Sequence, residues 1–167
     1  MIEAFLLSLV TNFGYLGVFL ASLIGSAATF VPLPSFLIVI TAGSVLNPAV
    51  VGVVAGVGAA LGELVGYGVG LGFFYSEKKF FKKKKLSKKE KGWTKIIEKW
   101  FNRKLGMLVI FIFAVTPLPD KIVGVFCGAI KYDIKKFLFA MLVGKIVLHL
   151  ILAYIGFYGI HFIGAFF

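Results

Sequence analysis

Long apolar stretches divide the chain, and the breaks between them predict its architecture. The two longest stretches cover about residues 48–75 and 134–158, and each exceeds the roughly 20 residues that one helix needs to cross a bilayer. From Ala4 to Ser76 the only charged side chain is Glu63. The pattern predicts an all-α polytopic membrane protein.

Shorter apolar arms come in two pairs, and a Pro-Leu-Pro motif separates the arms of each pair. Arms of this length are too short to cross the bilayer comfortably. A helix, a break and a second helix instead indicate a re-entrant hairpin, whose irregular backbone must be covered by protein or line a cavity. The predicted arms are about 14–28, 35–46, 105–115 and 120–130, with the re-entrant loops at 29–35 and 115–121.

The two hairpins are copies of one pattern. "FVPLPSFLIVITAG" ends at Gly43, and "VTPLPDKIVGVFCG" ends at Gly128, 85 positions later. If each hairpin returns to its own side, each repeat crosses the bilayer once, so the second repeat is inverted relative to the first, as in many transporters. The residues that define the re-entrant structure are Pro32, Pro34, Gly43, Pro117, Pro119 and Gly128.

Charge then divides the single transmembrane domain, residues 1–167, into three parts. The first repeat covers 1–76 and the second covers 105–167, and thirteen of the 18 basic residues lie in the connection 77–104. The positive-inside rule places this connection in the cytoplasm, which for a prokaryote means a protein of the plasma membrane. The N-terminus lacks the basic start and the cleavage site of a signal peptide.

The second half of the connection predicts an amphipathic helix, residues 92–104, that lies in the membrane surface. It either recruits anionic lipid headgroups or only anchors the topology. Nucleic acid is not an expected partner, because no recognition fold fits in this segment. The residues expected to contact the membrane surface are Trp93, Lys95, Lys99, Trp100 and Arg103.

Ionisable residues within the apolar segments are the candidate functional groups, because they are costly in a bilayer. Glu63 and His149 are each the sixteenth residue of their long segment, and Lys145 lies one helical turn before His149. They either form a transport site or, as a Glu–Lys pair, only hold the helices together. Proton or ion coupling is assigned to Glu63, Asp120 and His149, and binding of a substrate headgroup to Ser35, Thr116, Lys121 and Lys145.

Enzyme chemistry finds little support in the sequence. Cys127 is the only cysteine, and neither a metal-binding cluster nor a nucleophile elbow is present. Glycines recur every four residues within 48–75, the spacing that lets membrane helices pack closely. We therefore expect neither an enzyme nor a cofactor.

The two Pro-Leu-Pro loops, each followed by a glycine-closed arm and a long helix, resemble the DedA/VTT family, also called SNARE-associated Golgi protein-like, over about residues 14–160. Acidic residues around the first loop and arginines around the second are typical of that family. Here those places hold "GSAATFVPLPSF" and "AVTPLPDK". The charged residues that could take their part are Glu63, Asp120, Lys121 and Lys145.

The resemblance implies a transporter or lipid translocase, a flippase or a scramblase. We therefore expect an anionic lipid as substrate, a phospholipid or a polyprenyl phosphate, with the helix N-termini after Pro34 and Pro119 facing its head. Proton coupling would involve Glu63 and Asp120. A small-cation/proton antiporter and a non-transporting membrane scaffold are the alternatives. Other membrane lipids are expected partners, and a homo-oligomer is left open.

Overall fold

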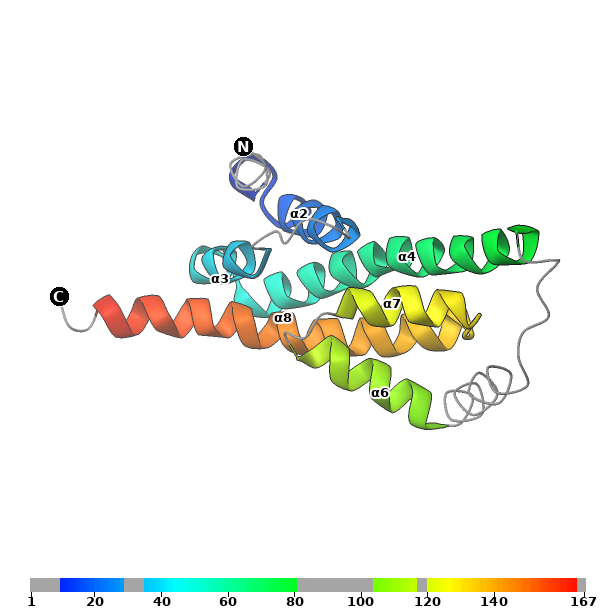
Figure 1. Cartoon of the computed structure of the whole chain (residues 1–167). Coiled ribbons are helices and arrows are strands. Elements are labelled where there is room, and N and C mark those ends of the chain that lie inside the picture. Colours follow the sequence, from blue (N-terminus) through cyan, green and yellow to red (C-terminus); the bar gives the residue numbers. More distant parts are fainter. Residues whose placement is uncertain (1–9, 29–34, 81–103, 117–119, 165–167) are drawn as a thin grey trace.

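The computed structural model describes residues 10–28, 35–80, 104–116 and 120–164, and every regular element in these ranges is an α-helix. The predicted all-helical class is thus confirmed for this part of the chain. Four short helices and two long ones follow one another in the order expected from the hydrophobic pattern (Figure 1). Their bounds are Tyr15–Ala27 (α2), Ser35–Val45 (α3), Pro48–Phe80 (α4), Lys104–Val115 (α6), Asp120–Ala129 (α7) and Ile134–Gly164 (α8).

The two long helices form the axis of the molecule. α4 and α8 lie side by side and run in opposite directions, as the colour gradient in Figure 1 shows. Gly52 of α4 faces Leu150 of α8, and Gly56 faces Ile146, so the missing side chains allow the two helices to approach closely. Within α4 and α8, the segments Pro48–Gly72 and Ile134–Gly159 are long and apolar enough to cross a membrane.

The short helices pack on the long ones in an exchanged pattern. The first helix of each pair packs on the long helix of its own half, α2 on α4 and α6 on α8. The second helix packs on the long helix of the other half, α3 on α8 and α7 on α4. A β-carbon at Gly43 would overlap the carbonyl of Ala153, and one at Gly128 would overlap the carbonyl of Tyr67. The two predicted repeats therefore make equivalent contacts.

Both long helices begin with the same kind of cap. The Asn47 side chain accepts hydrogen bonds from the backbone N–H groups of Ala49 and Val50, 3.0 and 3.4 Å away. The Asp133 carboxylate accepts from Lys135 and Lys136, at 2.9 and 3.2 Å. Such caps satisfy N–H groups that have no partner within the helix.

Two apolar cores fill the spaces between the helices. One joins α4, α6, α7 and α8 around Met141, and the other joins α2, α3, α4 and α8 around Val51. Along α8 the first core ends at Met141 and the second contains Ala153. Lys145 and His149 lie in the interval between these two residues, together with the buried Leu148.

The predicted bounds agree with the observed ones for the short arms and differ at the ends of the long helices. α4 continues to Phe80 rather than ending near residue 75, and α8 continues to Gly164 rather than 158. The extension of α4 passes beyond the apolar stretch that defined its predicted end, whereas the extension of α8 adds mainly apolar residues. The surface helix at 92–104, apart from its last residue, and both Pro-Leu-Pro motifs lie outside the described residues.

Candidate functional site

Four buried polar or charged side chains occur in the described residues, and three of them are the ionisable groups selected from the sequence. Glu63, Lys145 and His149 are only 1%, 3% and 2% exposed. The fourth is Ser22 of α2, at 2%. A buried charge must be paired to persist in an apolar interior, so these charged groups are expected to contact one another.

Glu63 and Lys145 form an ion pair across the two long helices. The Lys145 Nζ lies 3.5 Å from Glu63 Oε1. In the register set by Gly52 and Gly56, Glu63 is level with a point about six residues before Lys145, or about 9 Å along the axis. Helical side chains lean toward their own N-terminus, so in this antiparallel pair the two chains lean toward each other. The lengths of the two side chains then close the distance along the axis.

His149 extends this pair by one helical turn. Its Nδ1 lies 2.8 Å from the carbonyl oxygen of Lys145. On the other side its ring packs against Phe36 of α3, with the ring centroids 6.4 Å apart. Phe36 follows the first residue of α3, so His149 lies close to the point where the chain leaves the first Pro-Leu-Pro segment.

The opposite end of the site lies against α7. Glu63 Oε2 is 3.6 Å from the place where a β-carbon at Gly124 would stand. The carboxylate thus faces a part of α7 without a side chain. The site spans the interval from α7, through Glu63 and Lys145, to His149 and α3, and contains groups from both halves of the chain.

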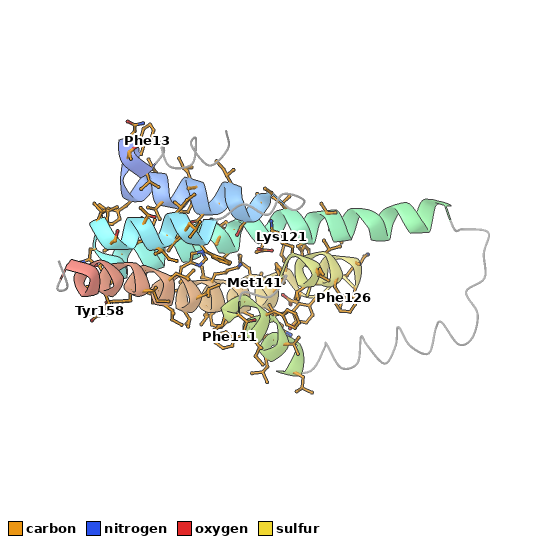
Figure 2. The ribbon with its side chains drawn as sticks, turned by 60° about the vertical axis from the view of Figure 1, so that its left-hand side comes forward. Phe13, Phe111, Lys121, Phe126, Met141 and Tyr158 are labelled. Carbon is orange, nitrogen blue, oxygen red and sulfur yellow. The ribbon has the colours of Figure 1, made fainter. Side chains whose placement is uncertain are left out.

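Lys121 lies outside this pair and connects the two hairpins. Its ammonium donates a hydrogen bond to the carbonyl of Ala28, the residue that caps the end of α2. A cation is favoured there by the exposed carbonyls of a helix C-terminus. Figure 2 shows Lys121 at the centre of the molecule. The bond thus joins Ala28, which precedes the first Pro-Leu-Pro loop, to Lys121, which follows the second.

The other predicted site residues are placed as follows. The Thr116 hydroxyl donates to the carbonyl of Ile112, 2.8 Å away, at the end of its own helix. Gly43 and Gly128 are sites of close helix packing. Ser35 and Asp120 begin α3 and α7, but their side chains are not among those described. Outside the described residues lie Pro32, Pro34, Trp93, Lys95, Lys99, Trp100, Arg103, Pro117 and Pro119.

Ser22, Phe36 and Gly124 were not selected from the sequence. The Ser22 hydroxyl is buried and has no hydrogen-bond partner within the part of the chain that the structure describes. Ser22 interrupts an apolar arm that also contains Ser26, whereas Phe36 and Gly124 resemble their neighbours and gave no signal in the sequence. Among the described residues, no group of three histidine, cysteine or acidic side chains could hold a metal ion.

Comparison with known proteins identifies the family. The VTT domain matches residues 33–158, which is well over half of the chain and includes all the ionisable groups of the site. The chain belongs to the VTT domain family. This is the DedA/VTT family that the two loops resembled, and its members are membrane proteins. The two long apolar helices of this VTT protein fit insertion into a membrane.

An archaeal relative extends over nearly the same length. An uncharacterized protein of Methanocaldococcus jannaschii is 28% identical over 149 residues, which cover 88% of this chain and 86% of the relative. No solved structure matches the chain. The family therefore identifies the kind of protein, whereas the chemistry of this chain depends on the residues of its site.

Proposed function

We propose that this VTT protein is a transporter that moves an amphiphile with an anionic head, a phospholipid or a polyprenyl phosphate, across the bilayer. The observation that carries the proposal is the buried ion pair between Glu63 and Lys145. Buried pairs often add no stability over apolar side chains of similar size, and ionisable groups at membrane depth are costly. An acid and a base between the two membrane helices therefore favour a role in transport.

Lys145 is the group suited to bind the anionic head. With Glu63 ionised the pair is neutral, so an arriving anion must compete with the carboxylate for the ammonium group. A proton on Glu63 removes that competition, so the Lys145 ammonium can bind the anion. The anion and one proton would then occupy the site together, which couples transport to the proton gradient.

The arrangement of the halves supports access to this site from both faces. We propose that α2–α3 and α6–α7 are inverted re-entrant hairpins, whose loops meet near the ion pair. The antiparallel long helices and the exchanged packing support this inversion. The bond from Lys121 to Ala28 supports the meeting of the loops.

Further groups at the hairpin tips complete the proposed site. α3 and α7 begin at Ser35 and Asp120, so their positive N-terminal ends lie next to the two loops. Lys121, Ser35 and Thr116 are proposed to contact the head, and Asp120 is a second candidate for the proton. The protein would lie in the plasma membrane with the 77–104 connection in the cytoplasm.

Purified protein in liposomes tests the function. The measurement is the rate at which a fluorescent lipid with an anionic head crosses the bilayer, beside a zwitterionic lipid with the same tails. We expect the anionic lipid to cross faster with wild-type protein and at the background rate with Lys145→Met. Lys135→Met is the matched control, because it removes an exposed lysine from the same helix and leaves the site intact.

Other results would lead to the alternatives. Cation-dependent proton flux without lipid movement would replace the lipid transporter by an antiporter in which Glu63 binds the cation. The absence of both activities would leave a membrane scaffold. Equal rates for the two lipids would contradict recognition of the head by Lys145.

A further inference from the structure

His149 is a buried ionisable group that the exchange between Glu63 and Lys145 leaves unused. Its Nδ1 lies 2.8 Å from the carbonyl oxygen of Lys145. A carbonyl oxygen can only accept a hydrogen bond, so Nδ1 carries a hydrogen in the neutral and in the protonated ring alike. Nε2 is therefore the atom at which His149 gains or loses a proton.

The position of His149 differs from that of Glu63 along the bundle. Glu63 Oε2 faces Gly124 of α7, whereas the His149 ring faces Phe36 of α3. Lys145 lies between them and contacts both, through its ammonium and through its carbonyl. The three ionisable groups thus form a series that leads from the α7 side of the site to the α3 side.

The described charges near His149 come from its own helix and from α4. On its own helix the neighbouring charge is Lys145, and α4 contributes Glu63. α2 and α3 contain no charged residue. The charged residues of α7 are Asp120 and Lys121, and the Lys121 ammonium is bonded to the Ala28 carbonyl. A proton on His149 places a second cation one turn from Lys145, where like charges repel, and Glu63 is the buried carboxylate that offsets it.

We propose that His149 is a second proton-carrying residue of the site and passes protons between the α3 side and Glu63. The inference rests on the proposed transport function. In this step the protonated ring gives its Nε2 proton to the Glu63 carboxylate through intervening water. The ring returns to the neutral form with hydrogen on Nδ1, and the carboxylic acid releases Lys145 for the anion.

Nuclear magnetic resonance tests the chemical part without any transport assay. The chain contains two histidines, so ¹⁵N-histidine labelling of the His161→Gln variant in nanodiscs reports on His149 alone. We expect the Nδ1–H form at alkaline pH and the imidazolium form on acidification through roughly pH 8 to 5. Glu63→Gln should move the midpoint of this conversion. An Nε2–H form, no titration or an unmoved midpoint would overturn the proposal.

A substitution tests the functional part. His149→Asn keeps a nitrogen at the δ position that can donate to the Lys145 carbonyl, and it removes the group that titrates. We expect unchanged thermal stability, lipid translocation reduced roughly tenfold or more, and a loss of its pH dependence. His161→Asn, the same change elsewhere on α8, should behave like wild type.

The two tests separate this inference from the proposed function. If lipid moves and His149→Asn keeps the wild-type rate and pH profile, His149 only supports the helix and the inference fails alone. If wild-type protein moves no lipid at any pH, the proposed function fails. The resonance experiment then still decides whether His149 and Glu63 share a proton.

Discussion

α3 and α7 occupy equivalent places in the two halves, and they differ in their chemistry. Each packs closely on the long helix of the other half, with Gly43 of α3 against Ala153 and Gly128 of α7 against Tyr67. The first turn of α3 places Phe36 beside a histidine, whereas the first turn of α7 places Lys121 on the end of α2. The packing is thus repeated and the polar contacts are not.

The difference indicates which features serve the fold and which serve the function. Close helix contacts need small residues at matched positions, and both halves provide them. The fold does not require a lysine in one first turn and a phenylalanine in the other. We therefore expect changes at the glycines to affect stability, and changes at the ion pair to affect transport.

The largest expected effect concerns the passage of the bundle across the bilayer. Val45, at the end of α3, and Lys135, at the start of α8, are exposed at opposite ends of the bundle. In a Cys127→Ala background, Val45→Cys and Lys135→Cys should react with an impermeant maleimide from opposite faces of the membrane. Labelling of both from the same face would contradict a bundle that crosses the bilayer.

A smaller effect is expected at the packing glycines. In Gly128→Ala the new methyl group would overlap the Tyr67 carbonyl, which belongs to the backbone and cannot rotate away. Overpacking of this kind costs about 1–3 kcal/mol. Gly43→Ala should cost a similar amount, because its methyl group would overlap the Ala153 carbonyl. Thermal unfolding in detergent measures both losses.

Gly124→Ala is the matched control on α7. Its methyl group would lie 3.5 Å from the nearest backbone atom, the Glu63 carbonyl oxygen, which is an ordinary contact. We expect little change in stability. Equal losses for Gly124→Ala and Gly128→Ala would show that the close approach does not determine the packing of α7.

The smallest effect concerns the caps of the long helices. The backbone N–H groups of Lys136 and Lys135 hold the pKa of the Asp133 carboxyl below its ordinary value. A lowered folded-state pKa stabilises the fold above the ordinary aspartate value of about 3.9, and this contribution is lost as the pH falls through the lowered pKa. Asn47 caps α4 without ionising, so its contribution does not depend on pH.

Thermal midpoints between about pH 6 and 3 test this difference. Asp133→Asn should keep the cap and remove a small part of the loss of stability in acid. Asn47→Asp should add a similar loss at the start of α4. An unchanged acid profile in both variants would exclude a contribution of these caps to the pH dependence.

The sequence predicted most of the described fold, because its breaks have strong local causes. Two prolines interrupt each hairpin, and the four short arms end within about a turn of their predicted bounds. The end of α4 was missed because Ser76–Phe80 is charged yet continues the helix. Hydropathy marks where an apolar stretch ends, and a helix can extend beyond that point.

The sequence predicted that three ionisable residues lie near one another, but it did not predict their individual contacts. Equivalent depth brought Glu63, Lys145 and His149 together, but it could not choose between the two cations as partner of Glu63. That choice depends on the register of α4 and α8, which close contacts of glycines determine. The bond from Lys121 to Ala28 joins residues 93 positions apart, and no local pattern indicates it.

The most direct test of the central claim compares Glu63→Gln, Lys145→Met and the double variant in thermal stability and in lipid translocation. Each single change leaves one buried group without its counter-charge and should cost about 3–5 kcal/mol, and the neutral double variant should recover that loss. We predict that the double variant is stable and moves no anionic lipid. A stable double variant with wild-type translocation would contradict the account, because the pair would then only hold the helices together.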